Sequence, residues 1–161
     1  MTGHTVAFDG RLQLRVLEEK HLAAAHALSV AVGWPHRPCD WRAVFRIGKG
    51  VVICDAMERV LGTAMLSPLG TSVAAVGMVI VAPGLQGQGI GRRLVRAVLD
   101  TAPSKTLLLN ATVSGLRLYE SEGFRAVGTI YQYQGIAKGP NGPIIATNVR
   151  PNIESDWAKI I

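Results

Sequence analysis

The sequence is poor in aromatic residues and in cysteine, and it has no long apolar run. Three Trp, three Tyr and three Phe stand among 161 residues, without the interleaved basic residues by which proteins bind single-stranded nucleic acid. No apolar stretch approaches the roughly 18 residues of a membrane-spanning helix. Cys39 and Cys54 lack metal-ligand spacing. We therefore expect no metal and free core thiols in a reducing compartment, with a disulfide as the less favoured alternative.

Acidic residues are also scarce. Asp and Glu number 11 against 17 Lys and Arg, which gives a formal net charge of +6. A basic chain can bind nucleic acid or a small polyanion such as a nucleotide phosphate. We favour the polyanion, because the basic residues are scattered except for Arg92, Arg93 and Arg96. No basic segment followed by an apolar block opens the chain, so we expect no signal peptide, no membrane association and a cytoplasmic location.

The hydrophobic pattern predicts strands and helices within one domain. We expect Asp40 to cap one helix and Thr112 another, with Gly123 ending the latter in the left-handed conformation. Two prolines predict a loop over 34–38. This order implies a mixed α/β sheet with helices on its faces. The expected strands are 12–16, 51–55, 59–67, 73–81, 106–110, 124–134 and 144–149; the expected helices are 18–32, 41–47, 112–122 and one that starts at Ile90 and stops at Pro103.

A glycine-rich loop joins the apolar strand 73–81 to the helix that starts at Ile90. Gly87, Gly89 and Gly91 let the backbone approach a ligand closely. The first N–H groups of the helix lack internal partners, and the helix dipole favours an anion there. A pyrophosphate is the natural occupant. Taken alone, the loop fits an ordinary turn without a ligand equally well.

Two common phosphate-binding patterns do not fit this loop. A P-loop requires Gly-Lys followed by Ser or Thr, which is absent. A dinucleotide fingerprint requires a third glycine where Arg92 stands, and an acidic residue at the end of the next strand, where Asn110 stands. A third pattern is needed to explain the loop.

Gln86, Gly89 and Gly91 fill the pattern Gln/Arg-x-x-Gly-x-Gly/Ala, so the loop resembles the signature of the GNAT superfamily of acyl-CoA-dependent N-acyltransferases. The segment 118–124, Leu-Tyr-Glu-Ser-Glu-Gly-Phe, resembles the end of a helix in the same family. One helix and one strand fit between the two motifs, as the family requires. The resemblance covers roughly residues 11–149 by the order of elements, and its specific motifs span 78–124.

The resemblance implies an N-acetyltransferase that moves acetyl from acetyl-CoA to a primary amine by direct attack, without a covalent acyl-enzyme. It implies a mostly antiparallel sheet of six to seven strands with helices on both faces, splayed between the fourth and fifth strands, with the pantetheine arm in the gap. The acceptor would be a small-molecule or peptide amine, and a homodimer is compatible with the family. A non-catalytic acetyl-CoA-binding sensor and a nucleic-acid-binding module are the alternatives.

The resemblance also assigns roles to residues near the loop. Tyr119 matches the tyrosine that protonates the departing thiolate in many members, although a buried ring with a bonded hydroxyl is the alternative. The N–H of Val79 would donate to the thioester carbonyl as a small oxyanion hole. The expected acetyl-CoA-binding residues are Val79, Ile80, Val81, Gln86, Gly87, Gln88, Gly89, Ile90, Gly91 and Arg92.

The general base and the acceptor site have weaker signals. Ala75 stands where some members carry a glutamate, so the amine proton needs another route. His36 is a candidate base, although a lone loop histidine is usually just exposed. Trp34 would stack on an acceptor or pack on a helix. Asn110 would bind water or substrate, or form a turn.

The last residues leave the domain organisation open. We expect one acetyltransferase domain over 1–149, followed by 150–161. That short segment contains Arg150, Asp156 and Trp157 in an order resembling the way a domain of this family begins. It is therefore predicted to be either a C-terminal arm or the start of a second module.

Overall fold

The computed structural model describes residues 6–8, 11–103, 105–133, 135–136 and 153. The chain divides into two units, 1–129 and 130–161. All the strands and helices described below lie in the first unit. In the second unit, the described residues belong to no helix or strand.

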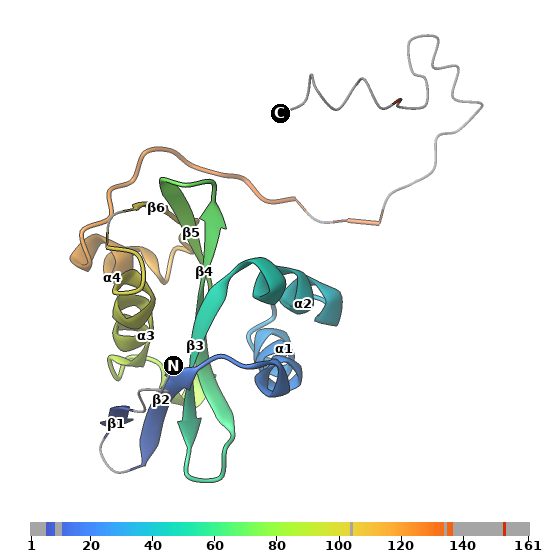
Figure 1. The fold of residues 1–161 in the computed structure, drawn as a ribbon, viewed down its shortest axis with the longest axis vertical. Coiled ribbons are helices and arrows are strands. Elements are labelled where there is room, and N and C mark those ends of the chain that lie inside the picture. The colour runs from blue at the N-terminus through green and yellow to red at the C-terminus, as the bar shows by residue number, and fades with distance from the viewer. Residues whose placement is uncertain (1–5, 9–10, 104, 134, 137–152, 154–161) are drawn as a thin grey trace. The chain divides into compact units, whose positions relative to one another are not determined.

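Six strands form one sheet in the order β1-β2-β3-β4-β5-β6 (Figure 1). The first five pair as antiparallel neighbours, and β6 runs parallel to β5. The sheet is therefore mixed but mostly antiparallel, as predicted. The strands are β1 (Val6–Phe8), β2 (Leu12–Val16), β3 (Lys49–Asp55), β4 (Val60–Leu69), β5 (Val73–Val81) and β6 (Thr106–Leu108).

Helices cover both faces of the sheet (Figure 1). On one face lie α1 (Leu22–Ala31) and α2 (Pro38–Ile47), and on the other lie α3 (Ile90–Leu99) and α4 (Leu116–Ser121). Short 3-10 turns, η1 (Glu19–His21) and η2 (Pro83–Leu85), precede α1 and follow β5. Gly123 follows α4 with a φ of 91°, so its predicted left-handed exit is confirmed. Gly33, which follows α1, is also left-handed, with a φ of 75°.

The core has two layers because successive strand side chains point to opposite faces. In β3, Val52 and Cys54 pack under α1 and α2, whereas Ile53 packs under α3. A buried hydrogen bond of 2.8 Å from Trp41 Nε1 to Ser29 Oγ ties α2 to α1. The two helix pairs are thus held on separate apolar layers of one sheet.

Two predicted helix starts are wrong. Helix α2 begins at Pro38, not Trp41, because a proline in the first turn needs no N–H partner and already has a helical φ. Asp40 lies inside that first turn, where its carboxylate accepts the N–H of Arg37 at 2.8 Å. Helix α4 begins at Leu116, because the hydroxyl of Thr112 accepts the N–H of Gly115 in a turn that precedes the helix.

Five of the seven predicted strands are present, and β1 was not predicted. Residues 124–133 form no strand, because alternating side chains do not make a strand without a hydrogen-bonded neighbour. The predicted strand at 144–149 lies outside the described residues, as does the predicted domain boundary at 149. The six strands described thus include one that was not predicted, so the predicted set of strands is confirmed only in part.

The two cysteines are both free, but only Cys54 is buried. Cys39 is exposed on the first turn of α2, so the prediction that it is a core thiol is wrong. None of the described helices is long and apolar enough to cross a membrane.

Candidate active site

Strand β5 is irregular in its second half. Thr63 of β4 lies opposite Ile80, and Met65 lies opposite Gly77. Met78 and Val79 of β5 therefore both lie opposite the single residue of β4 between Thr63 and Met65. This extra residue in β5 is a β-bulge. Met78 has a φ of 51°, which costs a residue with a Cβ about 1–2 kcal/mol.

A buried threonine holds this bulge. The hydroxyl of Thr63, whose side chain has no exposed surface, donates a hydrogen bond of 2.7 Å to the carbonyl oxygen of Met78. Such a bond contributes about 1 kcal/mol net, which is comparable with the strain at Met78. The contact therefore offsets much of the cost of the bulge.

β5 and β6 part beyond their first residues. They pair only over Val73–Ala75 of β5 and Thr106–Leu108 of β6. From Val76 onward, β5 has no β6 partner within the described sheet. These are the fourth and fifth strands of the predicted order, which lacks β1, so their short pairing agrees with the predicted splay. Residues 79–81 of β5 line the cleft described below.

The glycine-rich loop lies at the end of β5. Gly87 and Gly89 have φ of 75° and 78°, which residues with a Cβ adopt only at a cost. Gly89 is the N-cap of α3 and offers no side chain to its first N–H groups, so these donors are available to an anion. Gln86 is exposed, and its Nε2 donates to the carbonyl of Val81 at 3.1 Å.

Gly91 has a different role from the other two glycines. A Cβ at Gly91 would lie 3.3 Å from Cδ2 of Leu118, which is closer than ordinary van der Waals contact. The missing side chain lets the first turn of α3 approach α4.

Most of the predicted site residues line one cleft of about 680 Å³. Gln88, Ile90 and His36 are predicted site residues that do not line it. The lining that the sequence did not single out comes mainly from the segment before α4 and from α4 itself. The lining residues are Val32, Trp34, Val79, Ile80, Val81, Gln86, Gly87, Gly89, Gly91, Arg92, Asn110, Thr112, Ser114, Gly115, Arg117, Leu118 and Tyr119.

Tyr119 lines this cleft from α4. Its side chain is 9% exposed, and its ring meets Phe124 edge-on with 6.0 Å between centroids. Burial raises the pKa of its phenol above the ordinary value, because an apolar environment disfavours the phenolate. The phenol therefore stays protonated at neutral pH and holds a proton that it can give.

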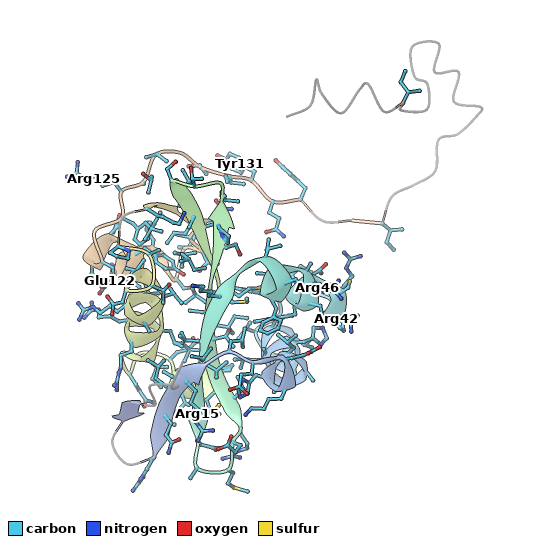
Figure 2. All side chains as sticks on the ribbon, viewed as in Figure 1. Arg15, Arg42, Arg46, Glu122, Arg125 and Tyr131 are labelled. Atoms are coloured by element: carbon cyan, nitrogen blue, oxygen red, sulfur yellow. The ribbon has the colours of Figure 1, made fainter. Side chains whose placement is uncertain are left out.

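Arg92 also lines the cleft, but its guanidinium is tied to the neighbouring helix. Glu122, at the end of α4, lies next to α3 (Figure 2) and is 7% exposed. Its Oε1 lies 3.1 Å from Arg92 Nε, an ion pair without hydrogen-bond geometry. Its Oε2 accepts a hydrogen bond of 2.7 Å from Arg96, and Ser121 accepts one of 3.0 Å from Arg92. This cluster joins the two helices that flank the cleft.

His36 does not line the cleft. Its ring meets those of Trp34 and Trp41 edge-on, at 5.4 and 6.2 Å between centroids. Burial lowers the pKa of His36 below its ordinary value, so the imidazole is neutral at neutral pH. Its Nδ1 is buried and has no hydrogen-bond partner among the described residues. Trp34, by contrast, lines the cleft and also packs against the core layer under α1 and α2, which is compatible with both of its predicted roles.

The arrangement agrees with comparisons with known proteins. The family model described as the acetyltransferase (GNAT) domain matches residues 39–140. The chain therefore belongs to the GNAT acetyltransferase family, a family of transferases that use acetyl-CoA.

Two named relatives match parts of the chain. The uncharacterized N-acetyltransferase YitH of Bacillus subtilis is 28% identical over 123 residues, which are 75% of this chain and 43% of YitH. The N-alpha-acetyltransferase RimI of Mycobacterium tuberculosis is 40% identical over 60 residues, which are 35% of this chain and 38% of RimI. The chain thus spans less than half the length of each of these relatives.

Solved structures share the fold. The GNAT family acetyltransferase SP0256 of Streptococcus pneumoniae matches with a TM-score of 0.64 at 25% identity, over 77% of this chain and 99% of that one. The ribosomal-protein-S18-alanine N-acetyltransferase of Escherichia coli has a TM-score of 0.64 at 21% identity, over 73% and 79%. A predicted acetyltransferase of Clostridium acetobutylicum, solved with acetyl-CoA, has a TM-score of 0.62 at 11% identity, over 76% and 96%.

Proposed function

We propose that this chain transfers an acetyl group from acetyl-CoA to a primary amine. One observation carries the proposal. A single cleft is lined by the bulge of β5, the N-terminus of α3 and the buried phenol of Tyr119. These supply a backbone donor, an anion site and a proton donor in a chain of the acetyltransferase family. The sensor alternative is not favoured, because the curated relatives are named as acetyltransferases.

Acetyl-CoA would be held mainly by backbone groups of the protein. Free N–H groups from Gly87 to Arg92 and the dipole of α3 would hold the pyrophosphate. The pantetheine arm would lie along Val79–Val81, in the gap where β5 and β6 part. Since Glu122 and Ser121 tie down the side chain of Arg92, we assign most of the phosphate binding to the backbone.

The reaction would proceed by direct attack. The amine nitrogen bonds to the thioester carbonyl carbon, and the N–H of Val79 donates to the oxyanion that forms. The C–S bond then breaks, and Tyr119 gives its proton to the departing thiolate. The proton that the amine loses goes to water, and Tyr119 regains its own from solvent.

The acceptor would be an amine of a small molecule or of a peptide. The relation to RimI, named as an N-alpha-acetyltransferase, makes a peptide N-terminus a candidate. Such an α-amine has a pKa of about 8, whereas that of a lysine side chain is above 10. Near neutral pH an α-amine is therefore more often uncharged and ready to attack.

Two measurements test this function. Calorimetry with acetyl-CoA should show one site, and no binding at millimolar acetyl-CoA would disprove the proposal. Thiol release should then be followed with a panel of amino acids, aminoglycosides and peptides with free N-termini. Binding without thiol release from any amine would favour the sensor alternative.

A further inference from the structure

The bulge of β5 places strain and a potential catalytic donor on adjacent residues. Met78 has the left-handed φ of 51°, and Val79, the next residue, lines the cleft. Neither residue has a regular partner in β4, and β6 pairs with β5 only up to Ala75. The orientation of the peptide group between Met78 and Val79 is therefore not set by regular strand pairing.

A single side chain fixes that peptide group. The carbonyl of Met78 and the N–H of Val79 belong to the same planar peptide unit. The hydroxyl of Thr63 donates to this carbonyl at 2.7 Å. Holding the carbonyl on the Thr63 side points the N–H the opposite way, because the two groups of a trans peptide point in opposite directions.

Thr63 is well placed to act as a rigid anchor. It lies in the middle of β4, its side chain has no exposed surface, and its backbone pairs with Ile80 beyond the bulge. A β-branched side chain has few χ1 rotamers to choose from, so the hydroxyl is held in one direction. Water does not compete for a donor buried this completely.

We propose that Thr63 is a positioning residue that aims the Val79 N–H at the thioester carbonyl of acetyl-CoA. This inference rests on the proposed function. Thr63 itself does not line the cleft, so it acts on the ligand only through the Met78–Val79 peptide. A preorganised donor stabilises an oxyanion more than one that must be oriented during the reaction.

The test compares acetyl-CoA with CoA, because only the former carries the carbonyl that Val79 would contact. Thr63→Val keeps the shape of the side chain and removes the donor, whereas Thr63→Ser keeps the hydroxyl. By calorimetry, Thr63→Val should weaken acetyl-CoA binding by about three- to tenfold, the range of one hydrogen bond. CoA binding should stay within about twofold, and Thr63→Ser should retain the wild-type preference for acetyl-CoA.

Further variants guard against a general loss of stability. Thr63→Ala also removes the donor and carries the test if Thr63→Val does not fold. Leu28→Ala removes apolar volume from the same core layer, so it should lower stability without changing the ratio of the two affinities. If Thr63→Val and Thr63→Ala keep the wild-type ratio of the two affinities, because neither affinity changes or because both fall equally, the inference is overturned. Wild-type protein that binds neither ligand would instead disprove the proposed function.

Discussion

Tyr119 combines a buried ring with a place on the wall of the cleft. Tyr119→Phe keeps the ring and its edge-on contact with Phe124 but removes the proton donor. If Tyr119 is the general acid, kcat should fall at least about tenfold, whereas acetyl-CoA affinity should change little. Thiol release at saturating acetyl-CoA measures the first quantity, and calorimetry measures the second.

The exposed Tyr131 offers a matched control for this variant. Its side chain is 76% exposed, so Tyr131→Phe should leave both quantities unchanged. The pH profile is a second readout. Because burial raises the pKa of Tyr119, the acid should stay protonated up to about pH 10 and be lost only above it. Tyr119→Phe should abolish that alkaline fall in kcat, and an unchanged profile would exclude the acid role.

At the scale of elements, the loop before α3 depends on one left-handed residue in particular. Gly89 has a φ of 78° and caps the helix whose N–H groups would hold the pyrophosphate. Gly89→Ala should destabilise this conformation by about 1 kcal/mol and weaken acetyl-CoA binding about fivefold or more. Calorimetry measures the affinity.

Gly84 in the same loop provides the comparison. A Cβ at Gly84 meets nothing within 4 Å, and its φ lies outside the left-handed region. Gly84→Ala should therefore leave acetyl-CoA affinity nearly unchanged. Equal effects of the two substitutions would show that the loop conformation at Gly89 does not matter for binding.

The contact between α3 and α4 is electrostatic as well as apolar. Glu122 is 7% exposed and faces the guanidinium groups of Arg92 and Arg96. Glu122→Gln leaves these cations without a carboxylate and should lower the free energy of unfolding by about 1–3 kcal/mol. Urea denaturation measures the change. Glu120→Gln, at an exposed position of α4, should change the free energy by less than about 0.5 kcal/mol, and equal losses would contradict this account of Glu122.

At the scale of the whole molecule, a ligand that binds only the folded chain must stabilise it. Acetyl-CoA at about 100 times its Kd should add about 2.7 kcal/mol to the free energy of unfolding. The midpoint of thermal unfolding should rise accordingly. NADH at the same concentration is the control, because the loop lacks the glycine and acidic residue of a dinucleotide site. An equal rise with NADH would show that the cleft binds pyrophosphates without selecting CoA.

Local signals in the sequence located much of the fold and of the donor side of the site. Gly123 was identifiable because left-handed backbone favours glycine, Gly87 and Gly89 because they make the loop glycine-rich, and Tyr119 because of its motif. The bulge at Met78 was invisible, since a strand of nine apolar or small residues shows no alternation that an extra residue could interrupt. The pairing of Glu122 with Arg92 was also missed, because contacts between helices far apart in the chain leave no local pattern.

The bulge in β5 also determines which layer of the core the residues after it enter. Before it, Ala74 and Val76 pack under α3, whereas after it Ile80 packs under α1 and α2. An unbroken strand would put all three side chains on one face. Loss of a single residue at 78 would take out the extra residue, so the strand would become regular and Ile80 would stay on the face that α1 and α2 cover. A one-residue deletion here should therefore disturb the packing of the core less than it disturbs the site, because it removes the Met78–Val79 peptide.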